Sequence, residues 1–260
     1  MFQPLPFPRR RLARLAFLPI LLLMAASLAA CVPQAASRAP GGGATAAMIP
    51  TASGRALAPG TPVIAVVART LPVAEAMCRA ERAHRRCDFV VAVDDDPAQP
   101  ANAFQTIDPE GRPIIVFTAA LLAEVRSADE LAFVLGHEAA HHIAGHIGRR
   151  QSHARTGAIM AGIWAQISGL DREGVARAQE LAAGLAAQQY SKEFELEADA
   201  LGAEVSWRAG YDPVRGAGFF TRLPDPGDHV LGSHPPNAQR QAVVADAVRR
   251  LEGTGFARGY

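Results

Sequence analysis

The sequence predicts an α+β protein, with a small sheet in the N-terminal part of the folded region and a mostly helical C-terminal part. Short β-branched runs come first along the chain, and turn residues separate them. Long segments with helical periodicity follow from residue 127 onward. Hydrophobic residues make up 49% of the 260 residues and charged residues 20%, which is typical of a globular protein and excludes a disordered chain.

Four segments have the composition of strands. The first is a β-branched run, TPVIAVVA, and the second is DFVVAV. The third and fourth are separated by Asp-Pro-Glu-Gly at residues 108–111, which is turn chemistry. The predicted strands cover residues 61–68, 88–93, 102–107 and 113–118.

The helical part begins with a capping box. Ser127 can accept a hydrogen bond from the third amide of the helix while the Glu130 side chain reaches back to the N-cap, and the helix is expected to continue to about Arg150. A long helix later in the chain is expected to end at Gly210. The further predicted helices cover residues 73–86, 156–167, 175–209 and 237–251.

Residues 1–30 have the pattern of an export signal. Four arginines between residues 9 and 14 precede 16 residues of apolar character that end in small side chains. A transmembrane helix needs about 20 apolar residues, so this stretch is short for an anchor. We predict a cleaved signal peptide, and an uncleaved anchor helix is the alternative.

Cys31 ends a sequence, Leu28-Ala29-Ala30-Cys31, that resembles the bacterial lipobox, in which the cysteine is acylated. Val32 stands where an aspartate would indicate inner-membrane retention, which favours the outer membrane. Residues 31–60 are rich in Ala, Pro, Gly and Ser and are predicted to form a lipid-anchored flexible linker, followed by one folded domain over residues 61–260. The predicted location is therefore the periplasm, at a membrane.

The other two cysteines fit an oxidising compartment. An even pair in an exported protein favours a disulfide between Cys78 and Cys87. The alternative, a metal site formed by these cysteines with His84, matches no common zinc spacing. Without the first thirty residues the chain has 22 basic and 25 acidic side chains, so its charge gives no reason to expect nucleic-acid binding.

One motif in the first long helix indicates metal chemistry. His137 and His141 are separated by one helical turn, so both imidazoles can reach one ion. Glu138 is rotated by about 100° from His137, beside the ion, where it can accept a proton from an activated water without acting as a ligand. Zinc sites of this kind need three protein ligands and one open position.

The third ligand is expected from an acidic segment on a later helix. Glu195 and Asp199 lie one turn apart, so one carboxylate can bind the ion while the other accepts a hydrogen bond from a ligating imidazole. We choose Glu195 as the ligand and Asp199 as the hydrogen-bond acceptor, and Glu197 is the competing candidate for the ligand. The metzincin class is excluded because Ala144 and Ile147 stand where it needs glycine and histidine.

The paired motifs, His137 to His141 and Glu195 to Gly202, resemble those of the gluzincin metallopeptidases that include HtpX, the CAAX prenyl proteases, the Oma proteases, BepA and LoiP. The resemblance extends over residues 61–252. It implies a zincin-like α+β domain that holds one zinc ion per chain through His137, His141 and Glu195, with Glu138 as the base. The match is best to the minimal, single-domain bacterial lipoprotein members.

Other segments of the chain match the same family. Asn102-Ala103-Phe104 corresponds to a strand whose edge can bind an extended substrate, and His234-Pro235-Pro236 with Arg240 corresponds to the family's HPP…R motif. For His234 the resemblance implies either a ligand that keeps the enzyme latent or a contact to the oxyanion or substrate, and a structural loop histidine is the alternative. Arg240 is a second candidate donor to the oxyanion. His146 is expected to be structural.

The predicted function is that of a zinc-dependent endopeptidase of the bacterial envelope, acting on unfolded or misassembled outer-membrane proteins. The alternative from another class is a zinc-stabilised chaperone that holds such proteins without cutting them. A lipid-anchored scaffold without metal would leave two histidines and two carboxylates unexplained. The sequence does not determine the oligomeric state.

Overall fold

The computed structural model describes residues 49–58, 60–81, 85–189, 191–225 and 235–255, which all belong to one compact unit over residues 44–260. The predicted signal peptide, Cys31, His84 and His234 lie outside the described residues. Within the described ranges, no helix combines the length and the apolar character that a membrane crossing requires.

A three-stranded sheet with the order β1-β3-β2 forms one layer of the domain. β1 (Val90–Asp94) pairs in parallel with β3 (Pro113–Thr118), and β2 (Ala103–Ile107) pairs antiparallel with β3. β2 is therefore an edge strand. The α+β fold class predicted from the sequence is confirmed.

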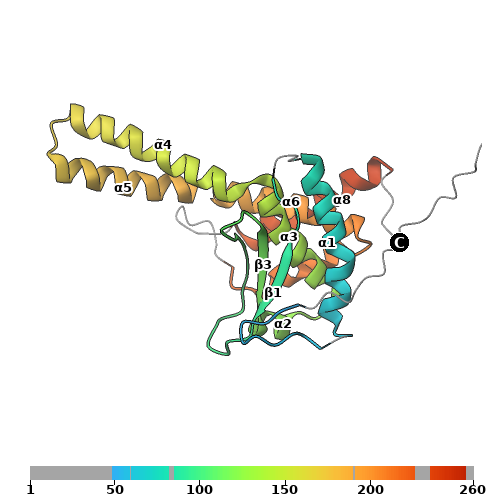
Figure 1. The fold of residues 1–260 in the computed structure, drawn as a ribbon. Coiled ribbons are helices and arrows are strands. Elements are labelled where there is room, and N and C mark those ends of the chain that lie inside the picture. Colours follow the sequence, from blue (N-terminus) through green and yellow to red (C-terminus); the bar gives the residue numbers. More distant parts are fainter. Residues whose placement is uncertain (1–48, 59, 82–84, 190, 226–234, 256–260) are drawn as a thin grey trace, which may run out of the picture. The chain divides into compact units, whose positions relative to one another are not determined.

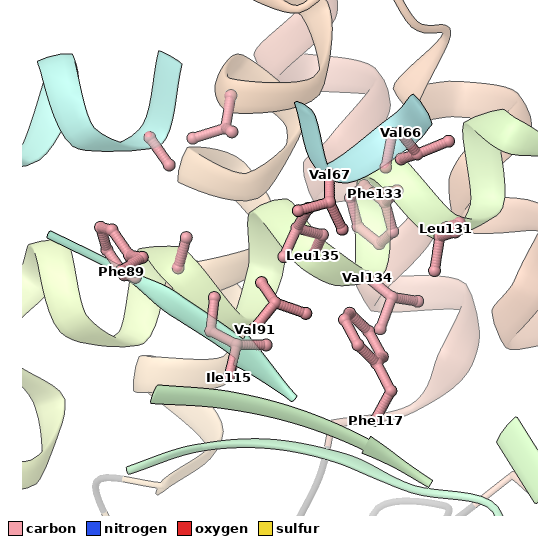
Figure 2. Packing of buried hydrophobic residues seen from close by; sticks show 14 of the residues in the cluster. Val66, Val67, Phe89, Val91, Ile115, Phe117, Leu131, Phe133, Val134 and Leu135 are labelled. Atoms are coloured by element: carbon pink, nitrogen blue, oxygen red, sulfur yellow. The ribbon is translucent and has the colours of Figure 1, made fainter. Parts of the chain in front are cut away.

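The hydrophobic core lies between the sheet and two helices, α1 (Pro62–Glu81) and α3 (Ala128–Ala144). Figure 2 shows Val91, Ile115 and Phe117 of the sheet facing side chains of α3, with Val66 and Val67 of α1 packed on the other side of that helix. Because α3 is enclosed from both sides, the position of every residue on it is fixed by core packing.

The strand predicted for residues 61–68 is wrong, because this segment forms the start of α1. Its buried residues, Val66, Val67, Thr70, Ala74 and Cys78, recur at helical spacing and face the core. β-branched residues favour strands only weakly, and burial of an amphipathic stripe against α3 outweighs that preference. Pro62 occupies the first helical position, where its missing N–H costs nothing.

The folded domain extends further toward the N-terminus than the predicted boundary at residue 61. Ile49 is 2% exposed and belongs to the core, and the segment after it lies along β1, where Val93 donates to the carbonyl of Pro50 and accepts from Ala52. Part of the predicted linker is therefore a structural element of the domain.

The helix predicted to run from residue 127 to about Arg150 ends earlier, at Ala144. Gly145 adopts a left-handed conformation with φ of 73°, and its N–H caps the carbonyls of α3. α4 (His146–Ile167) begins at the next residue and includes the predicted helix over 156–167. This turn, which only glycine adopts without strain, folds His146 back toward the end of α3.

The long helix predicted over residues 175–209 is two helices, α5 (Arg172–Gln189) and α6 (Ser191–Arg208). α4 and α5 run side by side as an antiparallel hairpin that extends away from the sheet, as Figure 1 shows. α6 returns to the core and packs on α3. The remaining elements are α2 (Ala119–Glu124), α7 (Pro213–Gly216), the 3-10 helix η1 (Ala217–Arg222) and α8 (Asn237–Gly253).

Candidate active site

A contact between the backbones of α3 and α6 brings the two sequence motifs together. A Cβ atom on Gly136 would lie 2.7 Å from the carbonyl oxygen of Gly202, and one on Gly202 would lie 2.7 Å from the backbone nitrogen of His137. Any larger residue at either position would separate the helices. The two glycines thus allow the side chains one or two turns away to meet across the helix pair.

Three potential ligand side chains converge at this crossing. The Nε2 atoms of His137 and His141 are 3.1 Å apart, Oε2 of Glu195 lies 3.4 Å from that of His137, and Oε1 of Glu195 lies 3.5 Å from that of His141. Ligand atoms around a tetrahedral zinc ion, each about 2.0–2.1 Å from it, are about 3.3 Å apart. The donor set and its spacing therefore fit a zinc site of the two-histidine, one-glutamate type.

The electrostatics of the site also fit a cation. Burial lowers the pKa of His137, but its hydrogen bonds to Asp199 and Glu195 outweigh burial and raise that pKa to about 10. Burial and the charge of His137 lower the pKa of His141 to about 3. The two carboxylates thus stabilise positive charge at the imidazole pair, whether a proton or a metal ion carries that charge.

Glu138 lies beside the imidazoles. One oxygen of Glu138 and one ring nitrogen each of His137 and His141 all lie within 4.8 Å of one another. Burial raises the pKa of Glu138 to about 7, and the backbone N–H of Gln105 on β2 opposes the shift by donating a hydrogen bond to it. A carboxylate with a pKa near neutrality can accept a proton and return it during one reaction cycle.

His137 is supported by a buried ion pair. Asp199, on α6, lies 2.9 Å from Nδ1 of His137 and accepts two hydrogen bonds from Arg240 of α8, at 2.7 Å and 2.8 Å. Asp199 is fully buried and Arg240 is 5% exposed. The guanidinium of Arg240 also lies 3.7 Å from the ring centre of Phe220. These contacts favour a positioning role for Arg240, whereas its predicted donation to the oxyanion stays a prediction.

His141 is held by a second set of hydrogen bonds, which the sequence did not predict. Its Nδ1 lies 2.8 Å from Nδ1 of His146, and Nε2 of His146 lies 3.3 Å from Glu197. Arg149 donates to the same carboxylate at 2.6 Å. Glu197, the competing candidate for the third ligand, therefore faces away from the imidazole pair. The only sequence signal for this arrangement is the glycine before His146, because it creates the turn.

The hydrogen bonds of this second support determine which nitrogen carries each proton. Glu197 can only accept when ionised, so Nε2 of His146 donates to it and Nδ1 of His146 is left as an acceptor. Nδ1 of His141 then donates to His146, which leaves Nε2 of His141 with a free lone pair. This is the tautomer that a metal ligand requires.

A cavity of about 610 Å³ opens in front of these residues. One side is the edge strand β2, which contributes Asn102, Ala103 and Phe104 as predicted, together with Gln105. The apolar part of the lining comes from α3, η1 and the residues after η1. Its main side chains are Phe133, Val134, Phe219, Phe220 and Leu223.

The backbone of β2 is oriented for pairing on the cavity side. Asn102 accepts a hydrogen bond from the backbone of Thr118, and in an antiparallel pair such bonds occur at alternate residues. Ala103 and Gln105 therefore direct their N–H and C=O groups away from β3. The N–H of Gln105 donates a hydrogen bond to the carboxylate of Glu138. This bond fixes the position of the carboxylate relative to the edge of β2.

The other candidate residues lie away from this cavity. A disulfide joins Cys78 to Cys87 at the end of α1, with a Cα separation of 5.7 Å. His142 points to the opposite side of α3, where Nε2 donates to the carbonyl of Arg86 at 2.7 Å. His234 and Cys31 lie outside the described residues, so the roles predicted for them stay predictions.

Comparison with known proteins agrees with this geometry. Residues 64–248 match peptidase family M48. The chain is also 30% identical over 143 residues to the mitochondrial metalloendopeptidase OMA1 of Arabidopsis thaliana, an alignment that covers 54% of this chain and 28% of that protein. The chain therefore corresponds to less than a third of that relative's length. Because the family match covers most of the sequence and includes both motifs of the site, the chain belongs to peptidase family M48, a family of metallopeptidases.

Proposed function

We propose that the chain is a zinc-dependent endopeptidase that holds one zinc ion through His137, His141 and Glu195. The observation that carries the proposal is that Nε2 of His137, Nε2 of His141 and the carboxylate group of Glu195 lie 3.1–3.5 Å from one another, close to the spacing around a tetrahedral ion. A binding protein stabilised by zinc would have no use for the buried carboxylate of Glu138 beside those ligands.

Glu138 carries the proton transfers in this proposal. Zinc in such a site supplies Lewis acidity, which activates a water molecule and polarises the substrate carbonyl. Glu138 accepts the proton of the attacking water as the new C–O bond forms. It then donates that proton to the amine nitrogen as the C–N bond breaks, so the residue is regenerated. The hydrogen bond from Gln105 keeps the carboxylate oriented through both steps.

The proposed substrate is a polypeptide in an extended conformation. Its backbone would pair with the outward N–H and C=O of Ala103 at the edge of β2, as an added strand. The apolar side of the cavity, formed in part by Phe133 and Phe219, would accept an apolar side chain next to the cleaved bond. A folded protein cannot offer its backbone in this way, so unfolded or misassembled chains are the proposed targets.

The proposed location is the periplasm, with a lipid anchor at Cys31 and the outer membrane favoured. The support comes from the export pattern of residues 1–30 and the lipobox-like sequence that follows. The disulfide between Cys78 and Cys87 fits an oxidising compartment as well. Envelope proteins that fail to assemble are therefore the proposed natural substrates, and His234 is the proposed residue for latency or for contact with the substrate.

The test is digestion of unfolded casein by the chain and by its Glu138→Gln variant. We expect about one zinc per chain in both proteins, since Glu138 is not a ligand. Cleavage should fall by about 100-fold or more in the variant, because its amide cannot accept the proton. Glu193→Gln, at an exposed position of α6, is the matched control and should cleave at the normal rate.

Two outcomes would contradict the proposal. Equal cleavage by Glu138→Gln and wild type would show that another group is the base. Inactive wild-type protein that binds zinc and still prevents casein aggregation would favour the chaperone alternative. If wild type is inactive but His234→Ala cleaves casein, His234 holds the enzyme latent and the peptidase assignment stands.

A further inference from the structure

The hairpin of α4 and α5 has its small residues inside and its large apolar residues outside. A Cβ atom on Gly157 would lie 2.8 Å from both the carbonyl oxygen of Ala182 and the Cβ of Ala186, and one on Gly162 would meet Gln179. The two helices are therefore in contact through glycine and alanine. A hairpin that folds in water normally buries its large apolar side chains at this contact instead.

The large apolar residues of α4 point away from α5. Ile159, Met160, Ile163, Trp164 and Ile167, here called the outer face of α4, are 48–74% exposed. At 100° per residue they cover about 140° of the helix circumference. Leu181 and Leu185 of α5 are exposed as well, by 66% and 46%. An apolar surface of this kind on a soluble domain marks a site that another surface covers.

The charge pattern of α4 distinguishes between possible partners. Residues 156–170 contain no charged residue, and residues 139–170 contain three arginines and no acid. The arginines all precede the outer face, at positions 149, 150 and 155. Arg149 pairs with Glu197, whereas Arg150 and Arg155 are exposed and are the two that we assign to lipid. A helix with a wide apolar face, an exposed tryptophan and only basic charges is typical of binding to an anionic lipid surface. A helical protein partner would instead select a narrow apolar seam flanked by charges of both signs.

We infer that the outer face of α4 lies on the surface of a bilayer that contains anionic phospholipids. The apolar part of α4 from residue 156 to Ile167 is about 18 Å long, too short to cross the hydrocarbon core. Asp171, Arg172 and Glu173 follow at the turn, and their charges oppose insertion of the hairpin end-on. The hairpin therefore lies flat, with Trp164 at the level of the head groups.

The N-terminal part of the chain makes this contact sterically possible. Seventeen residues separate the predicted acylation site, Cys31, from Ile49, the first described residue. Such a segment spans at most about 60 Å. An anchored domain is thus held near the membrane at high effective concentration, so even a weak affinity of the outer face for lipid would keep α4 on the surface.

The experiment measures the contact locally, with the full chain reconstituted on vesicles of phosphatidylglycerol and phosphatidylethanolamine. Trp164 is one of two tryptophans, and the other, Trp207, is 5% exposed. Phospholipids brominated on the acyl chains should quench Trp164 fluorescence by about twofold or more, and Trp164→Phe gives the contribution of Trp207. Because every variant keeps the same N-terminal segment, the predicted anchor does not affect the comparison.

Ile163→Glu is the test variant and Val214→Glu the matched control, since both residues are 48% exposed. We expect quenching to be lost with Ile163→Glu, and with Ile167→Glu as a second variant, but retained with Val214→Glu. Phosphatidylcholine vesicles or high salt should weaken it. The variants should cleave a soluble peptide as the wild type does, so this result is independent of the proposed peptidase activity.

Several outcomes would overturn the inference. Wild-type Trp164 that brominated lipid does not quench, or equal quenching in Ile163→Glu, would show that α4 is not on the bilayer. A doubled mass in sedimentation that Ile163→Glu reduces to the monomer, without lipid quenching, would show that a second copy of the chain covers the outer face. If quenching were retained with phosphatidylcholine vesicles at high salt, electrostatic attraction between the arginines and anionic lipid would not contribute to binding.

Discussion

The two imidazoles that we propose as zinc ligands are held in place by very different contacts. His137 depends on Asp199 and Arg240, which are 0% and 5% exposed. His141 depends on His146, and beyond it on Glu197 and Arg149, whose side chains are 39% and 42% exposed. His137 is thus held by a charge pair inside the core. His141 is held by a series of hydrogen bonds that runs from the buried His146 to charged side chains at the surface.

Because of this difference, we expect changes near His137 to affect the stability of the fold and changes near His141 to affect metal binding. A charge pair removed from water must remain complete, because loss of one partner leaves the other charge buried and unpaired. A pair that water can reach is replaceable, since solvent takes the place of the missing group. We therefore expect the support of His137 to be essential for the fold and that of His141 to affect mainly the ligand.

The largest effect is expected from Asp199→Asn. The variant keeps the size of the side chain but removes the carboxylate that accepts two hydrogen bonds from the buried guanidinium of Arg240, which is then left with the more distant Glu195, 3.6 Å away. We expect the free energy of unfolding to fall by about 3–5 kcal/mol and the zinc content to fall with it. Urea denaturation followed by circular dichroism, with zinc determined on the same samples, measures both.

Glu204→Gln is the control for this change. Glu204 pairs with Arg208 on the same helix, but the two side chains are 27% and 34% exposed. Its loss should change the free energy of unfolding by less than about 1 kcal/mol. A similar, small decrease in the free energy of unfolding for Asp199→Asn and Glu204→Gln would show that burial does not make the Asp199–Arg240 pair more important for stability than the Glu204–Arg208 pair.

A smaller effect, limited to the metal, is expected from His146→Phe. His146 stacks on Phe194 with ring centres 4.6 Å apart, and phenylalanine preserves this stacking while removing the acceptor for His141. The affinity for zinc should fall by about 10–100-fold, as measured by competition with a chelator. Stability without metal should be almost unchanged.

Two further variants provide a control for His146→Phe and a variant with a smaller expected effect on zinc affinity. His153 also contacts Phe194, with ring centres 6.0 Å apart, so His153→Phe is a matched control that should leave zinc affinity unchanged. Glu197→Gln should weaken zinc binding less than His146→Phe, because its carboxylate is half-exposed and one step further from the ligand. If Glu197→Gln had the larger effect, the carboxylate would contact the ion directly, as in the competing assignment.

The site residues that share one helix face could be predicted from the sequence. The contact that depends on a turn between two helices could not. His137 with His141, and Glu195 with Asp199, are spaced by one helical turn, so their convergence needs only that each segment be a helix. His146 is five residues from His141 and would point elsewhere on a continuous helix. It reaches its partner only because Gly145 breaks the helix, and a single glycine is a weak signal.

The error at the start of the domain has a different origin. Residues 61–68 have the composition of a strand, and no local signal outweighs it apart from Pro62. The helix exists because α3 offers a surface on which Val66, Thr70 and Ala74 can be buried together. Packing between α1 and α3, which begin at Pro62 and Ala128, decides the structure here, and a local pattern does not contain that information.

A third histidine of α3, His142, is also held by specific contacts but is not among the proposed zinc ligands. It is 6% exposed, donates to the carbonyl of Arg86 and packs edge-on against Phe89. Burial lowers the pKa of His142 below its usual 6.5. The ring is therefore neutral in the folded chain at a pH where the unfolded chain already binds a proton.

The smallest predicted effect follows from this lowered pKa. As the pH falls below 6.5, protonation of His142 favours the unfolded chain, so the free energy of unfolding decreases, with a slope of at most about 1.4 kcal/mol per pH unit. His142→Gln can still donate to the carbonyl of Arg86 but does not titrate. Urea denaturation at pH 7.5 and 5.5 should therefore show a smaller pH dependence for the variant than for wild type, while zinc affinity at pH 7.5 stays the same. Equal pH dependence in the two proteins would show that His142 is not held neutral, and a loss of zinc would show that the two sides of α3 are not independent.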